Sequence, residues 1–193
     1  MKYEKALQLR KSRCIYALFA GQRHNSHYMR SIQLAGAENR LHGTGKEYNM
    51  NKYRELTQRQ QEEANALPWK FAFSNKQFAE MMDEYGLTVE DTDKIYKLGN
   101  TGGFYLKTDS DLIRGTLDRH DRELREAIAA DTTGEGFIYD MFSYELANHE
   151  YCITGDVDET LDAVGLTYDE VKADDRLWHG LRLALRHYIG KFD

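Results

Sequence analysis

Apolar residues recur at helical spacing through most of the second half of the chain. A long amphipathic helix is predicted from Asp109 or Ser110, because apolar residues repeat every three or four positions and charged residues lie between them. The apolar residues of this helix are Ile113, Leu117, Leu124 and Ile128. The next helix, from Glu135 to about His149, is apolar around its whole axis, which predicts a central, buried position. Further helices are expected at 157–164, 168–173 and 175–190.

The stretch before this long helix contains clear start and stop signals for shorter helices. Residues 52–66 are polar and helix-prone, and Pro68, the only proline, ends them. Ser74 and Gln77 have the spacing of a capping box, and Gly86 is placed to end the helix that this box begins.

A short acidic helix is predicted next, with Thr88 as its cap and its end at about Leu98. Residues 99–103 are rich in glycine and predict a turn, and 104–106 predict a brief strand. The fold class is therefore mainly α: a compact multi-helix domain with a short glycine-rich β-turn or hairpin near 99–106 and a basic N-terminal arm.

One short pattern occurs twice. Residues 86–91 read Gly-Leu-Thr-Val-Glu-Asp, and residues 165–170 read Gly-Leu-Thr-Tyr-Asp-Glu. Each copy combines a helix stop with a threonine cap and acidic residues, which the helix dipole favours at a helix N-terminus. We therefore expect a capped helix after each copy.

Charge divides the chain into two parts. The net charge is -6, but residues 1–54 carry 11 Lys and Arg against 3 Asp and Glu, whereas 55–193 carry 15 against 29. This asymmetry predicts a basic arm or extension at 1–49 and an acidic helical domain at 50–193. Met50 follows a lysine–glutamate pair that a ribosome-binding site would encode, so a native start at Met50 stays an alternative.

The composition favours a cytoplasmic protein. Cys14 and Cys152 are the only cysteines, too few for a disulfide framework or a zinc motif. The apolar run at 15–21 is short for a signal peptide and far below the length of a membrane span. We expect no membrane association and no cofactor.

Few residues in the sequence have a spacing that suggests catalysis or metal binding. Glu145 and His149, four residues apart on the predicted buried helix, can point the same way and share a proton or a metal ion, or form an internal hydrogen bond. His120 and His179 resemble histidines at the edge of a core. Because no nucleophile motif accompanies them, we expect no catalytic residue and no enzymatic activity.

Two charged surfaces and one possible DNA-binding unit remain. Residues 75–106 can be interpreted as a helix-turn-helix with a glycine wing, although the acidic second helix, 88–98, disagrees with contact to phosphates. The basic arm has the composition of a nucleic-acid-binding segment; its candidate residues are Arg10, Lys11, Arg13, Arg23, Arg30 and Arg40. An acidic surface could face a basic partner; its candidate residues are Asp83, Glu84, Glu90, Asp91 and Asp93.

Three stretches carry a family resemblance: 50–63, which begins Met-Asn-Lys-Tyr-Arg-Glu-Leu, 133–142, Thr-Gly-Glu-Gly-Phe-Ile-Tyr-Asp-Met-Phe, and 145–151, Glu-Leu-Ala-Asn-His-Glu-Tyr. Over about 50–180 the chain resembles a family of short uncharacterised proteins on phages and integrative elements of anaerobic gut bacteria. The resemblance implies a context in which small acidic proteins often inhibit host defence, including anti-CRISPR proteins that block a Cas nuclease.

The leading expectation is a non-enzymatic binding protein that inhibits a Cas9-type nuclease through the acidic surface, with a protein partner and with nucleic acid possible at the arm. One alternative is a nucleic-acid-binding regulator that uses the arm and residues 75–106. The other is a small metal-dependent hydrolase built on Glu145 and His149.

Overall fold

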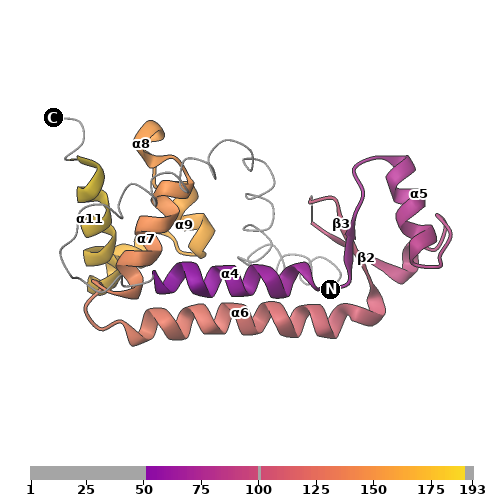
Figure 1. Ribbon diagram of the computed structural model, residues 1–193, viewed down its shortest axis with the longest axis horizontal. Helices are drawn as coiled ribbons and strands as arrows, with labels where there is room; N and C mark the ends of the chain where they lie inside the picture. Colours follow the sequence, from indigo (N-terminus) through magenta and orange to yellow (C-terminus); the bar gives the residue numbers. More distant parts are fainter. Residues whose placement is uncertain (1–50, 100, 190–193) are drawn as a thin grey trace, which may run out of the picture.

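Two long helices lie side by side and connect two differently built ends of the molecule (Figure 1). The computed structural model describes residues 51–99 and 101–189. The helices are α4 (Lys52–Asn65) and α6 (Ser110–Ala130), which run in opposite directions and which we call the bridge. A sheet lobe (69–109) lies at one end of the bridge and a helical lobe (131–189) at the other. The predicted mainly α fold is confirmed, whereas the predicted arm, 1–49, lies outside the described residues.

The bridge helices begin and end where their sequences indicate. The Asn51 side chain accepts a hydrogen bond from the backbone N–H of Arg54 and caps α4, and Pro68 follows the end of this helix. The start of α6 at Ser110 agrees with the predicted start, and Ile113, Leu117 and Leu124 are buried along it.

The sheet lobe contains more β-structure than the sequence pattern predicted. Its strands are β1 (Trp69–Phe71), β2 (Ile95–Leu98) and β3 (Gly103–Leu106), in the order β1-β3-β2 and antiparallel throughout. The glycine turn and the strand at 104–106 are confirmed. The predicted helix from Thr88 to Leu98 is wrong, because only a 3₁₀ turn at Thr92–Lys94 forms before the chain pairs with β3.

Helices cover both faces of this sheet. On one face, Trp69, Tyr105 and Leu98 pack with Ile113 and Leu117 of α6. On the other face, Ile95 packs with Met81 and Met82 of α5 (Asn75–Glu84). The Ser74 hydroxyl accepts from the N–H of Gln77, so Ser74 caps α5 as predicted, but the reciprocal bond of a capping box is replaced by one from the N–H of Phe73 to the Gln77 side chain. Gly86 follows the end of α5 at φ 69°.

The helical lobe is organised around α7 (Phe137–Asn148), which is central as predicted. Ile138, Met141, Phe142 and Leu146 are completely buried. They pack against the remaining helices of the lobe, α8 (Tyr151–Thr154), α9 (Asp158–Val164), α10 (Tyr168–Ala173) and α11 (Asp175–Ile189), and against Tyr53 of α4. No helix in the described ranges is both long and apolar enough to cross a membrane.

The loop from α6 to α7 is ordered by the carboxylate of Asp131. This carboxylate accepts backbone N–H groups of Thr133, Gly134, Gly136 and Ile138 at 2.9–3.1 Å. Burial alone would raise the pKa of Asp131, but the hydrogen bonds outweigh it and lower the pKa to about 2. The Thr-Gly-Glu-Gly sequence therefore has a structural role at the start of α7.

Candidate functional site

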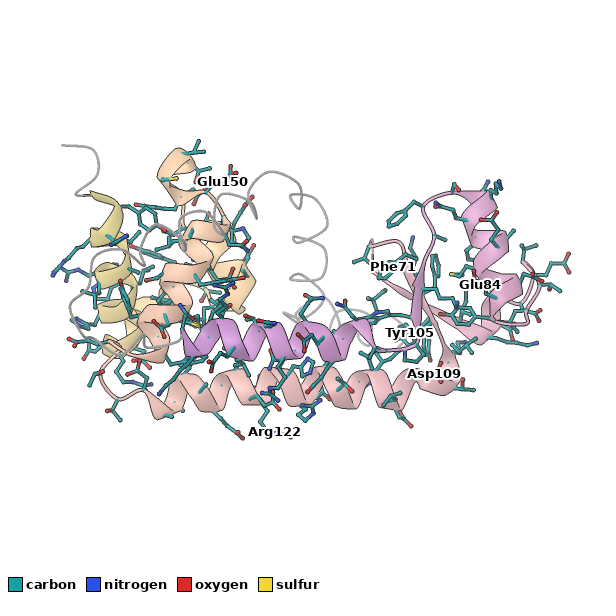
Figure 2. The ribbon with its side chains drawn as sticks, viewed as in Figure 1. Phe71, Glu84, Tyr105, Asp109, Arg122 and Glu150 are labelled. Carbon is teal, nitrogen blue, oxygen red and sulfur yellow. The ribbon has the colours of Figure 1, made fainter. Side chains whose placement is uncertain are left out.

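An acidic edge lies at the outer end of the sheet lobe. Between Glu80 and Asp93, which span the second half of α5 and the turn after it, the chain has six carboxylates and no Lys or Arg. Figure 2 shows Glu84 at this end of the molecule, far from the helical lobe. All five residues predicted for the acidic surface lie in this segment, which we call the acidic edge.

Two of the five predicted residues are held by neighbours. Glu84 forms an ion pair with Lys70 of β1. Asp91 accepts hydrogen bonds from the N–H and the hydroxyl of Thr88 at 2.8 Å and lies 2.8 Å from the Lys94 ammonium. The Lys94 contact and the Thr88 hydrogen bonds lower the pKa of Asp91. Asp91 therefore serves first to order its own turn.

The other three predicted residues, Asp83, Glu90 and Asp93, are exposed. Within the described part of the chain, their side chains form no hydrogen bond and no ion pair. Val89, beside Glu90, is 51% exposed. The acidic edge thus combines solvated carboxylates with an apolar side chain, a combination that suits contact with a basic protein surface.

The bridge contains a different kind of charged cluster, in which acids and bases neutralise one another. Glu63 of α4 lies 2.5 Å from Arg119 and 2.7 Å from Nε2 of His120, and both contacts lower its pKa. Glu123 of α6 lies 3.0 Å from Arg59 and accepts from Gln60 at 3.0 Å. His120 is 1% exposed, in agreement with its interpretation as a histidine at the edge of a core. The partner Glu63 comes from a distant part of the chain, and local spacing gave no signal for it.

The predicted pair of Glu145 and His149 belongs to a cluster in the helical lobe. Glu145, 6% exposed, accepts hydrogen bonds from the hydroxyl of Tyr53 and, at 3.3 Å, from Asn148. His149 lies 3.5 Å from Glu145 through Nε2 and 3.4 Å from Glu159 through Nδ1. At 3.5 Å the contact with Glu145 is an ion pair when His149 is protonated; it lacks the geometry of a hydrogen bond, and Nε2 is buried.

This cluster ties three helices together. The proximity of Glu145 raises the pKa of His149 although burial opposes the charge, and Glu159 adds to the increase. Among the described residues, no group of three or more His, Cys, Asp and Glu side chains could hold a metal ion. The arrangement connects α4, α7 and α9, and we interpret it as an internal clasp.

The remaining predicted residues are placed as follows. His179 is exposed and lies 3.1 Å from Glu135, so its interpretation as a core-edge histidine is wrong. Residues 75–106 contain one helix and a hairpin, and the second helix of a helix-turn-helix is missing because Ile95–Leu98 is a strand. The basic residues of the arm, from Arg10 to Arg40, lie outside the described residues.

A family model described as a family of unknown function, DUF7659, matches residues 52–187. The chain belongs to this family. The matched region begins in α4 and ends in α11, so it contains the bridge and both lobes. Membership of an uncharacterised family, which the sequence motifs indicated, is thereby confirmed. No curated protein and no solved structure matches the chain.

Proposed function

We propose that this protein is a non-enzymatic binding protein that inhibits a nucleic-acid-targeting defence complex of a host cell, with a Cas9-type nuclease as the first candidate. The acidic edge is the contact surface. The observation that carries the proposal is the group of exposed, unpaired carboxylates, Asp83, Glu90 and Asp93, in a segment without cations.

Charge complementarity explains how such a surface would act. An RNA-guided nuclease holds its heteroduplex in a positively charged channel and recognises the backbone of that duplex. Carboxylates presented by a folded protein are attracted to the same cations, and a bound inhibitor excludes the nucleic acid from the channel. The position of the acidic edge at the end of the molecule allows it to enter such a channel ahead of the bridge (Figure 1).

The choice of a defence complex as the partner rests on the resemblance to proteins of phages and integrative elements. On such an element, an inhibitor of a host nuclease would protect the element from cleavage. The surface chemistry itself supports the wider class, a nucleic-acid-binding protein with a basic channel.

The test is cleavage of a target plasmid by a Cas9 ribonucleoprotein at increasing concentrations of the full chain. Wild-type protein should block cleavage, and it should do so less well when NaCl rises from about 0.05 M to about 0.3 M, because salt screens exposed charges. The triple variant Asp83→Asn/Glu90→Gln/Asp93→Asn should need about tenfold more protein for the same inhibition, which corresponds to about 1.4 kcal/mol.

A matched control removes three charges from the bridge, in Asp111→Asn/Asp118→Asn/Glu126→Gln. These residues of α6 are exposed, and the control should inhibit like wild type. Equal loss in both triple variants would show that only net charge matters and would contradict the assigned surface. A folded wild-type protein that blocks nothing but retards duplex DNA or RNA would favour the nucleic-acid-binding alternative.

A further inference from the structure

A second acidic surface lies on the helical lobe, at the other end of the molecule. From Glu150 to Asp162 the chain has five carboxylates and no Lys or Arg, and all five are exposed. They are Glu150, Asp156, Asp158, Glu159 and Asp162. Ile153, in the same segment, is 76% exposed, more than any other large hydrophobic side chain whose burial the structure describes. We call this surface, formed by α8, α9 and their connection, the α8–α9 face; Figure 1 labels the two helices, and Figure 2 labels Glu150.

The helical lobe as a whole also carries an excess of negative charge. Residues 131–189 carry 13 Asp and Glu against 4 Lys and Arg. In the bridge, by contrast, Arg59 and Arg119 form ion pairs with Glu123 and Glu63 across α4 and α6. The α8–α9 face therefore combines negative charge with an exposed apolar side chain, and a basic segment with an apolar run is complementary to both.

The described chain starts beside this lobe. The amide group of Asn51 donates to the carbonyl oxygen of Asp140 at 3.3 Å, and the N–H of Lys52 donates to the Asp140 carboxylate at 3.3 Å. Both bonds fix the beginning of α4 against α7. The described chain thus begins at the helical lobe and not at the sheet lobe.

Residues 1–50 have the complementary composition. They carry 9 Lys and Arg against 3 Asp and Glu, and they include the uncharged apolar run 15–20. A covalently attached segment encounters a neighbouring surface at an effective concentration of about 1 mM, so even weak charge pairing suffices for binding. We infer that residues 1–50 of the same chain bind the α8–α9 face, with their cations against its carboxylates and their apolar run against Ile153.

This inference is independent of the proposed function, because it requires no nuclease and no external partner. It assigns the basic segment to the helical lobe, and it leaves the acidic edge of the sheet lobe as the acidic surface open to other molecules. The acidic edge is the poorer site for the segment, because it lies at the opposite end of the bridge from the beginning of α4.

Zero-length crosslinking tests the inference on the full chain. A carbodiimide joins a lysine amine directly to a carboxylate, and mass spectrometry of the monomer identifies the joined peptides. We expect links from lysines of the segment, at positions 2, 5, 11 and 46, to carboxylates of the α8–α9 face. The ion pairs Lys70–Glu84 and Lys94–Asp91 serve as internal controls that must also be linked.

The triple variant Glu150→Gln/Asp158→Asn/Asp162→Asn removes three of the five carboxylates. It should reduce the total yield of links between the segment and this face about fivefold, and about 0.5 M NaCl should do the same in the wild type. The bridge variant Asp111→Asn/Asp118→Asn/Glu126→Gln should retain the wild-type yield. Circular dichroism and a thermal melt establish that each variant is folded.

Three results would overturn the inference. Links from the segment that go mainly to Asp83, Glu84 or Glu90 would place it on the sheet lobe. Links confined to the crosslinked dimer would make a second copy of the chain the occupant of the face. Control links at Lys70 and Lys94 without any link from the segment would show that the face does not bind it. None of these results depends on whether the protein inhibits a nuclease.

Discussion

The two lobes use the same short sequence pattern and build different structures from it. In the helical lobe, Thr167 and Glu170 form a complete capping box, and α10 follows. In the sheet lobe, Thr88 donates through its N–H and its hydroxyl to Asp91 in a closely similar way, but no α-helix follows. The local hydrogen bonds are thus set by the pattern, and the structure after them is set by tertiary packing.

The residues after each pattern explain the difference. After Asp91 the chain reaches Ile95 and Leu98, which are buried on opposite faces of the sheet as β2 pairs with β3. After Glu170 it reaches Val171, which is completely buried among the helices of its lobe. Packing of one strand between two helices therefore outweighs the weak helix preference of an acidic segment.

The largest expected effect comes from Gly134, in the loop that anchors the helical lobe. Its φ is 80°, and a Cβ atom there would lie 2.2 Å from the carbonyl oxygen of Arg176. Gly134→Ala should therefore lower the free energy of unfolding by about 3 kcal/mol or more, since strain and steric overlap add. Urea denaturation followed by circular dichroism measures the change.

Gly86, at the end of α5 in the sheet lobe, is the matched control. Its φ of 69° is similar, but a Cβ atom there would meet nothing within 4 Å. Gly86→Ala should lower the free energy of unfolding by only about 1–2 kcal/mol, the contribution of the left-handed backbone alone. Equal losses at both glycines would show that the close contact between Gly134 and Arg176 is not rigid.

A medium effect is expected from the two threonine caps. Thr167→Ala removes both hydrogen bonds of the Thr167 hydroxyl, including the one that caps the N–H of Glu170 in α10, and should lower the free energy of unfolding by about 1 kcal/mol. Thr88→Ala removes only the hydroxyl bond to Asp91 and has no following α-helix to destabilise, so about half of that loss is expected. Both variants keep the hydrogen bond of the threonine N–H. Urea titrations of the two variants give the values. A larger loss at Thr88 would contradict the distinction between the lobes.

The smallest expected effect is the pH dependence of the free energy of unfolding that arises from His149 in the clasp of the helical lobe. Because the pKa of His149 is raised in the folded state, its charge stabilises the fold below the unfolded pKa, near 6.5, and this contribution is lost as pH rises through the folded pKa. Between about pH 6 and pH 8.5 the free energy of unfolding should fall by at most about 1 kcal/mol. The sheet lobe offers no matching histidine in its described residues.

His149→Gln is the variant that isolates this effect. Its stability should vary less with pH than that of the wild type over the same range, when both are measured by chemical denaturation at several pH values. Identical pH profiles would show that the contacts of His149 with Glu145 and Glu159 do not depend on its charge.

The sequence predicts a helix correctly where its buried residues all lie in one continuous stretch. The buried residues of α6 recur at helical spacing, and the apolar residues of α7 surround its axis. β1 was missed because Trp69–Phe71 is too short to show alternation. β2 was missed because helices cover both faces of the sheet, so Ile95 and Leu98 are both buried and the one-sided alternation of an exposed sheet is absent.

In the candidate sites, too, residues on one element could be predicted from the sequence, whereas their partners on other elements could not. Glu145 and His149 were found together because they are four residues apart on one helix. Tyr53 and Glu159 complete their cluster from α4 and α9, and no local spacing reveals such partners. The acidic edge was identifiable as a segment, but the separation of Asp83, Glu90 and Asp93 from the bound carboxylates of Glu84 and Asp91 required the positions of Lys70 and Lys94.

The bridge fixes the distance between the two lobes. The helix α6 has 21 residues, and at about 1.5 Å per residue it is about 30 Å long. Ion pairs and the buried side chain of Gln60 hold α4 against α6, so the two lobes are kept at a constant separation. A macromolecule that touches both lobes at once must therefore present two contact areas separated by about the length of this helix.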